Sequence, residues 1–208
     1  IAWRDDPTGL PGYHLIIPAE SAQHIWTNLL AKFGSSTELG KRQLRPIGWA
    51  AFNAVRVEGG RALFGIDFDG ASIASASPGK KEESDAGPLG TLPAETGMLD
   101  RAVSFTKGCY LGQEIVARMH ARSQVARQIV GIRMESDALP IAGSEVFDEN
   151  STTVGMITSS TISPILSNAA ICLAMLKRPH FAVGTKLRIP AEGAIRIGNV
   201  VETPFIKE

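Results

Sequence analysis

The chain has 208 residues, and its 21 basic side chains balance 21 acidic ones, so the formal net charge is zero. This balance argues against a broad surface for nucleic acid or for an anionic membrane. No apolar stretch reaches the roughly 18 to 20 residues of a membrane span, and the first residues lack a signal-peptide pattern. The two cysteines form no disulfide framework and no recurring metal-ligand spacing, which favours a reducing compartment. We therefore expect no membrane partner, no bound metal and a cytoplasmic location, with the mitochondrial matrix as the alternative.

The first third of the chain predicts a short strand followed by a helix. A turn cluster at residues 8–12 leads into apolar residues 13–17, which Pro18 closes. Apolar side chains then recur at helical spacing over residues 22–33, with Gly34 placed to end the helix. We expect the aromatic residues of this helix, Trp26 and Phe33, to lie in the core. Residues 61–67 resemble a second strand.

Residues 47–58 have mixed propensity, because Val55 and Val57 favour a strand while the alanines favour a helix. We interpret the segment as a helix that ends at Gly59 and Gly60. Glu58 then lies in the last turn, where the helix dipole disfavours a carboxylate. This position makes Glu58 a candidate functional residue. The alternatives are that it pairs with Arg56 or Arg61, or that it is solvated.

The second half of the chain predicts a small barrel or sandwich of short strands. Residues 71–90 contain few large apolar side chains, so we expect a mobile loop there. A boundary follows near residues 122–128. Beyond it, short strand-like runs are separated by turns, and they lie at residues 129–134, 145–147, 154–158, 170–176, 186–189 and 195–201.

The segment KGCYLGQEIVAR, residues 107–118, contains Cys109. Gly108 and Gly112 bracket this cysteine, and the pattern becomes helical from Leu111. Cys109 would then lie at a helix N-terminus beside Lys107, where the helix dipole makes a thiol more nucleophilic. The alternative is a small buried apolar residue in a connector. Cys172 lies in an apolar run, where we expect it to be a packing residue.

The same segment resembles the signature of the YgfZ-type folate-binding proteins. These are relatives of the glycine-cleavage T-protein, an aminomethyltransferase, and they support iron–sulfur protein assembly or maintenance. Residues 8–13, 55–60, 155–164 and 204–205 resemble other parts of the T-protein in the expected order. The resemblance implies an α+β fold, with a partial ferredoxin-like, folate-binding region at residues 1–125 and a C-terminal antiparallel β-barrel at residues 126–208. Family members carry a further upstream segment with the T-protein's catalytic aspartate, which we expect this chain to lack.

The resemblance also implies roles for single residues around a tetrahydrofolate or a folate derivative. Glu58 would bind the pterin, whose two-donor edge suits a carboxylate. Phe52 or its neighbour Trp49 would stack on a folate ring, and Lys107 would meet the glutamate tail. These residues, with Tyr110 and Gln113 of the motif, are the predicted cofactor-binding set.

Cys109 is the predicted catalytic residue, acting on folate-borne one-carbon units or in transient contact with iron or sulfur. We further expect Glu58 and Lys107 to line one cleft. The first functional hypothesis is a folate-binding factor that supports iron–sulfur client or assembly proteins. The second is a tetrahydrofolate-dependent aminomethyl- or one-carbon-transferase, and the third is a folate-free interaction module.

Overall fold

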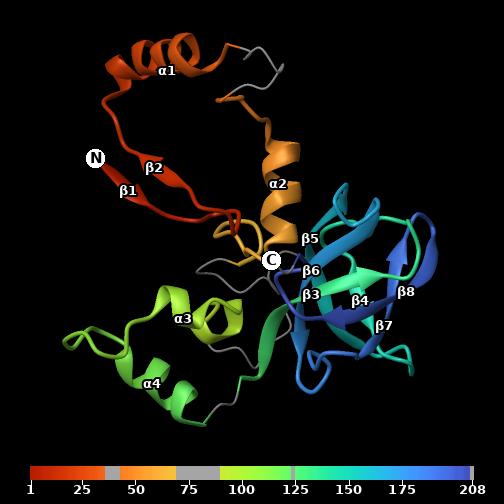
Figure 1. Cartoon of the computed structure of the whole chain (residues 1–208). Coiled ribbons are helices and arrows are strands. Elements are labelled where there is room, and N and C mark those ends of the chain that lie inside the picture. Colours follow the sequence, from red (N-terminus) through yellow and green to blue (C-terminus); the bar gives the residue numbers. More distant parts are fainter. Residues whose placement is uncertain (36–42, 69–89, 123–124, 207–208) are drawn as a thin grey trace.

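The computed structural model describes residues 1–35, 43–68, 90–122 and 125–206. Figure 1 shows a compact barrel at the C-terminal end and a more open arrangement of helices before it. The predicted loop at residues 71–90 lies outside the described residues, apart from Gly90. Within the described ranges, no helix is long and apolar enough to cross a membrane.

The C-terminal region is a closed antiparallel barrel in the order β3-β6-β5-β4-β7-β8. Its strands are β3 (Arg127–Met134), β4 (Glu145–Phe147), β5 (Thr153–Ser163), β6 (Ala169–Lys177), β7 (Lys186–Ala191) and β8 (Ala194–Val201). All six overlap runs predicted from the sequence, where short strand-like runs are separated by turn residues. The predicted barrel is confirmed.

The wall of the barrel packs against apolar side chains on its inner face and on part of its outer face. Its interior is filled by one apolar cluster that includes Ile132, Ile157 and Leu187. A second cluster lies outside the barrel wall, where Val57 packs with residues such as Ile171 and Leu173. Strand β6 belongs to both clusters, so all its residues from Ala170 to Leu176 are buried. The barrel therefore offers an apolar outer face on which a helix docks.

The region before the barrel contains helices and one small sheet. Strands β1 (Ala2–Arg4) and β2 (Tyr13–Leu15) pair with each other, and α1 (Ala19–Phe33) and α2 (Trp49–Glu58) follow. The 3-10 helix η2 (Pro93–Thr96) and the helices α3 (Leu99–Ala102) and α4 (Gln113–Arg122) complete it. Of these elements, α2 rests on the barrel wall at β5 and β6 (Figure 1).

Two sequence predictions are wrong. Helix α1 contains no buried residue, and Trp26 is 51% exposed, because no described element covers its apolar stripe. The strand predicted at residues 61–67 is absent from the structure, where residues 65–67 form a turn between Phe64 and Phe68, which pair in an isolated bridge. The Asp67 carboxylate accepts a hydrogen bond from the Leu63 N–H at 2.8 Å, and the Asp67 N–H donates to the Leu63 carbonyl at 2.9 Å. These local bonds fold the segment back on itself, as short polar side chains often do.

Candidate functional site

The last turn of α2 is the most deeply buried part of the region before the barrel. Arg56, Val57 and Glu58 are all buried, although two of them carry a charge. Val57 packs on the barrel wall, and because of the helical period its two neighbours flank that contact. A buried polar side chain is costly unless it is hydrogen-bonded. The partners of Arg56 and Glu58 therefore define the candidate site.

Arg56 forms a buried ion pair with Asp67. Its Nη1 lies 2.6 Å from Asp67 Oδ2, and the two side chains are 1% and 0% exposed. Arg56 also donates to the Arg61 carbonyl at 3.0 Å and to Ser159 Oγ at 2.6 Å. Thr158 Oγ1 completes the cluster with a 2.6 Å hydrogen bond to Asp67 Oδ1. The pair thus joins α2, the turn at residues 61–67 and strand β5.

An irregularity in β5 lets two neighbouring residues reach this ion pair. The register with β6 shifts between Ile157 and Ser159. In a regular strand, consecutive side chains point to opposite faces, and a bulge re-aims one of them. Thr158 and Ser159 are both buried here, and both bond to the Arg56–Asp67 pair.

Glu58 has a different partner from either alternative derived from the sequence. Its Oε1 accepts a hydrogen bond from Ser163 Oγ at 2.5 Å, and the residue is only 3% exposed. It is therefore not solvated, and Arg56 pairs with Asp67 instead. The Glu58 carbonyl accepts a 2.8 Å hydrogen bond from the Phe205 N–H of the C-terminal segment. The carboxylate is consequently held in one position at the junction of α2 and the barrel.

Trp49 and Phe52 lie at the start of the same helix. Their ring centroids are 5.4 Å apart with a 34° angle between the planes. Trp49 is 58% exposed and Phe52 is half-buried. One residue further on, Asn53 donates to the Ser160 carbonyl of β5 at 3.2 Å, which fixes this face of the helix against the barrel. The rings of Trp49 and Phe52 together form an accessible aromatic surface.

The KGC segment forms a second, separate group. Lys107 Nζ lies 4.6 Å from the centroid of the Tyr110 ring, and the Tyr110 N–H donates to Gln113 Oε1 at 3.2 Å. Gln113 is the first residue of α4, so the helix begins two residues later than predicted, after Gly112 adopts a left-handed φ of 85°. Cys109 precedes this turn and is exposed. Its thiol is accessible, as a reactive cysteine requires.

The predicted residues are thus collected in two places. Trp49, Phe52 and Glu58 lie on α2, whereas Lys107, Cys109, Tyr110 and Gln113 lie around the start of α4. Figure 1 shows α4 at the lower left, apart from the contact between α2 and β5 near the middle of the molecule. No hydrogen bond or ring contact among the described residues joins Glu58 to Lys107. A cleft shared by these two residues stays a prediction.

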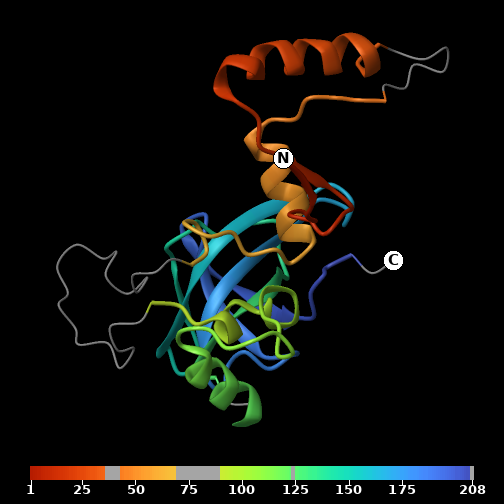
Figure 2. The same ribbon diagram turned by 90° about the vertical axis from the view of Figure 1, so that its left-hand side faces the viewer.

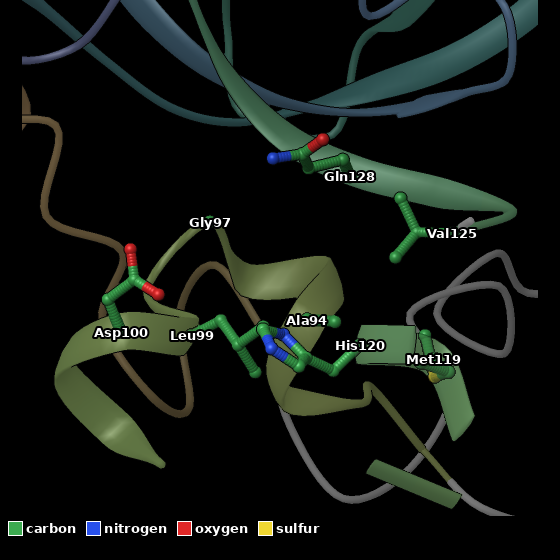
Figure 3. A pocket seen from close by; sticks show the side chains of 8 residues that line it. All are labelled: Ala94, Gly97, Leu99, Asp100, Met119, His120, Val125 and Gln128. Atoms are coloured by element: carbon green, nitrogen blue, oxygen red, sulfur yellow. The ribbon is translucent and has the colours of Figure 1, made fainter. Parts of the chain in front are cut away.

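A pocket of about 310 Å³ lies beside α4, and Figure 3 shows its side chains. Helices η2, α3 and α4 and strand β3 supply its wall, which contains Ala94, Gly97, Leu99, Asp100, Met119, His120, Val125 and Gln128. The ring of His120 in the pocket wall stacks on Phe105, which lies two residues before the KGC segment, at a centroid distance of 4.1 Å. None of the predicted site residues lines this pocket. Among the described residues, no group of three or more His, Cys, Asp or Glu is arranged to hold a metal ion.

A second ion pair fastens the pocket region to the barrel. Arg127 Nε lies 3.1 Å from Glu95 Oε1, and the two side chains are largely buried. Glu95 also accepts the Leu92 N–H at 2.8 Å and thereby caps η2. Sequence reasoning missed both ion pairs. The one signal for Arg56 was a charged residue inside the apolar run Val55-Arg56-Val57. Its ion-pair partner Asp67 lies 11 residues further on, in a segment that we predicted as a strand.

Comparisons with known proteins agree with this architecture. Residues 127–207 match the family described as the glycine cleavage T-protein C-terminal barrel domain. A crystal structure of glycine cleavage system aminomethyltransferase T from Bartonella henselae superposes with a TM-score of 0.73 at 20% identity, over 99% of this chain and 49% of that one. The chain therefore has a T-protein-like fold, and residues 127–207 are similar to the C-terminal barrel domain of the glycine cleavage T-protein.

Sequence similarity extends over nearly the whole chain. It is 31% identical over 203 residues to the aminomethyltransferase of Cutibacterium acnes, with 96% of this chain and 46% of the relative covered. It is 26% identical over 201 residues to the aminomethyltransferase of Chlorobium luteolum, with 96% and 47% covered. The chain thus spans about half the length of the curated relatives that it matches.

Proposed function

We propose that this chain is the tetrahydrofolate-binding part of a protein that supports iron–sulfur protein assembly or maintenance. The observation that carries the folate proposal is the buried Glu58 carboxylate at the end of α2. A carboxylate at a helix C-terminus is electrostatically unfavourable, because it faces the negative end of the helix dipole. A bound ligand that donates hydrogen bonds to the carboxylate would offset this cost. The two-donor edge of a pterin is a partner of matching chemistry.

The residues of α2 suit an elongated ligand such as folate. Trp49 and Phe52 offer flat rings on the first turn, and Glu58 offers a carboxylate on the last turn. Phe52 and Glu58 are six residues apart, which is about 9 Å along the helix axis and about a third of the way around the helix. Trp49 lies on the side of the helix opposite Glu58 and extends the aromatic surface through its ring contact with Phe52. A ligand that reaches both Phe52 and Glu58 must be long and must carry a ring together with hydrogen-bond donors. Tetrahydrofolate, when bound, would supply the carrier for one-carbon units.

The iron–sulfur part of the proposal rests on Cys109 and the KGCYLGQE motif. The thiol is exposed, and Lys107 and Tyr110 form an ordered contact around it. An exposed thiol in an ordered turn can reach a protein client or a bound one-carbon unit. The Tyr110 N–H donates a hydrogen bond to Gln113 Oε1, and this bond fixes the turn. In the proposal, Tyr110 and Gln113 therefore position Cys109.

A tetrahydrofolate-dependent aminomethyltransferase is the second candidate function. It is favoured by the relatives, since the curated proteins named above are aminomethyltransferases. The two candidates share the folate site and differ in the need for Cys109. In cells from which this protein has been deleted, the Cys109→Ser variant should fail to restore iron–sulfur enzyme activity under the first proposal. Under the second, it should leave aminomethyl transfer unchanged.

The folate site is tested by calorimetry with tetrahydrofolate. Glu58→Gln should weaken binding by about 1.5–3 kcal/mol, which is the range for a hydrogen bond to a charged group and corresponds to roughly 10- to 150-fold. Glu95→Gln is the matched control, because Glu95 is equally a buried carboxylate at a junction with the barrel. Thermal unfolding of both variants separates lost binding from lost folding. Equal affinities for wild type and Glu58→Gln would make Glu58 a structural residue only.

A further inference from the structure

The two oxygens of the Glu58 carboxylate differ in their partners. Oε1 accepts the Ser163 hydroxyl at 2.5 Å, whereas no hydrogen bond or ion pair from the described residues reaches Oε2. Both residues are buried, and Ser163 is completely so, at 0% exposure. Figures 1 and 2 both show the end of α2, which carries Glu58, against the barrel. Ser163, the last residue of β5, holds the carboxylate from the barrel side.

The Ser163 hydroxyl acts as a donor toward Glu58. A hydroxyl has one proton to donate, and an ionised carboxylate can only accept. The oxygen of the hydroxyl accepts the Leu166 N–H at 3.2 Å, and a backbone N–H cannot become an acceptor. Among the described residues, Glu58 is the one acceptor for the Ser163 proton. The turn after β5 and the carboxylate thus fix the direction of this hydrogen bond together.

We infer that Ser163 is a positioning residue for the ligand of Glu58, because it fixes which carboxylate oxygen is left for that ligand. Rotation about the last side-chain bond of a glutamate is only weakly restricted. The hydrogen bond from Ser163 removes this freedom and leaves Oε2 as the free acceptor. The inference deepens the proposed folate function and rests on it for the identity of the ligand. Ser163 acts on binding through Glu58 and does not touch the ligand.

This arrangement selects one class of ligand. An ionised carboxylate offers only acceptors, so the group that meets Oε2 must be an N–H or O–H donor. The ring N–H and the exocyclic amine of a pterin meet this requirement. A heterocycle that places a carbonyl or a lone-pair nitrogen there would set two acceptors against each other. Ser163 contributes to this selectivity, because it prevents the carboxylate from turning away.

A glutamine at position 58 would make the effect of Ser163 measurable. The carbonyl oxygen of an amide accepts and its NH2 group donates, so the two ends of the side chain are no longer equivalent. A buried hydroxyl proton without an acceptor is costly. Ser163 should therefore donate to the carbonyl oxygen of the glutamine. The NH2 group would then face the ligand, where it opposes the donors of a pterin.

Calorimetry with tetrahydrofolate on wild type, Ser163→Ala, Glu58→Gln and the double variant tests the inference. In the wild-type background, Ser163→Ala should weaken binding about three- to tenfold, because the carboxylate gains rotational freedom. In the Glu58→Gln background, the same change should strengthen binding by about threefold or more, because the amide can flip and present its oxygen. A serine that only stabilises the fold would not strengthen binding in either background. The reversal of sign is therefore the decisive result.

Ser160→Ala is the matched control. Ser160 lies on the same strand, and its hydroxyl donates to the Pro140 carbonyl at 2.6 Å, away from Glu58. Its removal should not strengthen binding in the Glu58→Gln background. Because the decisive result is a gain of affinity, partial unfolding of the double variant cannot mimic it.

A measurement without ligand separates failure of this inference from failure of the folate proposal. The Ser163 hydroxyl proton is buried and hydrogen-bonded, so in the free protein it should exchange slowly and give its own NMR signal. With 13C-labelled serine, the signal is assigned through its contact with the Ser163 Cβ protons and should be absent in Ser163→Ala. It should persist in Glu58→Gln, because the hydroxyl still donates there. Persistence without any binding of tetrahydrofolate to wild type would overturn the folate site and support the orientation of residue 58 by Ser163.

Two results would overturn the inference. One is loss of the hydroxyl signal in folded Glu58→Gln, which would show that the Ser163 proton no longer has its acceptor. The other is a folded double variant that binds tetrahydrofolate no more tightly than Glu58→Gln. If circular dichroism shows that the double variant is unfolded, the hydroxyl signal in Glu58→Gln decides alone.

Discussion

Arg56 and Asp67 carry opposite charges where almost no water reaches them, with side chains that are 1% and 0% exposed. Moving a charged group out of water costs several kcal/mol. The attraction between the two charges offsets this cost only when the geometry is good and further hydrogen bonds are present. Four such bonds are present, from Arg56 to the Arg61 carbonyl and to Ser159, and to Asp67 from the Leu63 N–H and Thr158. The pair is therefore expensive to break and well suited to hold α2 in one position.

Asp67→Asn should consequently destabilise the protein by about 3–5 kcal/mol, the range for removing one partner of a buried pair. The buried Arg56 guanidinium would keep its charge and lose its counter-ion. Urea unfolding followed by circular dichroism measures the change. Asp137→Asn, at an exposed position of the barrel, is the matched control. A loss below about 1 kcal/mol for Asp67→Asn would show that the pair contributes little, as exposed ion pairs do.

The two cysteines should differ sharply in reactivity. Burial raises the pKa of Cys172 from 9.0 to about 12, because the interior of the barrel disfavours a thiolate. Its thiol should resist iodoacetamide at pH 8 and react only as the pH approaches that range or as the protein unfolds. Cys109 is exposed and should be labelled at pH 8. Mass spectrometry of peptides after a timed exposure gives the order, and earlier labelling of Cys172 would contradict it.

At the scale of single elements, the contact between β5 and β6 leaves no room for a side chain at Gly155. A Cβ added there would lie 2.2 Å from the Met175 carbonyl oxygen, a backbone atom that cannot turn away. Gly155→Ala should therefore force the two strands apart and cost about 1–3 kcal/mol, as other overpacked substitutions do. Gly108→Ala is the control, because nothing lies within 4 Å of a Cβ at that position. Equal unfolding midpoints for the two variants would contradict the expected strain.

The elements show where local sequence patterns suffice and where they fail. Short strand-like runs separated by turn residues predicted the six barrel strands, including β6, a continuous apolar run that is buried on both faces. The alanines of residues 47–58 predicted helix α2, and Gly59 predicted where it ends. The strand predicted at residues 61–67 was wrong, because Asp67 forms hydrogen bonds to Leu63 and Arg56. An apolar run in the sequence does not reveal such bonds.

The candidate site was less predictable than the fold. Glu58 was singled out because a carboxylate is unusual at a helix end, and it is indeed buried. Its partner Ser163 is 105 residues away, and Ser159 is 103 residues from Arg56. Contacts at such separations depend on how α2 docks on the barrel, which no local pattern encodes. The apolar stripe of α1 was recognised, but its burial requires a surface that the described residues do not provide.

For the molecule as a whole, stability should fall steadily from the barrel to the N-terminus. Strand β6 is buried from Ala170 to Leu176 and pairs with β3 on one edge and with β5 on the other, so hydrogen exchange of its amides should require global unfolding. Amides of α1, β1 and β2 should exchange through local opening, at rates at least a hundred times faster. Hydrogen-exchange mass spectrometry of the chain alone measures this gradient. Uniform protection across α1 and β6 would show that the N-terminal part is stabilised within the chain.

The extra residue in β5 also bears on how related sequences are expected to vary. Deleting one residue between Ile157 and Ser159 would restore regular pairing with β6, so the barrel could still close. Thr158 and Ser159 could then no longer both meet the Arg56–Asp67 pair, and α2 would lose its polar attachment. Insertions and deletions at this point should therefore co-vary with Arg56 and Asp67 across homologues, while the residues that fill the barrel change independently of them.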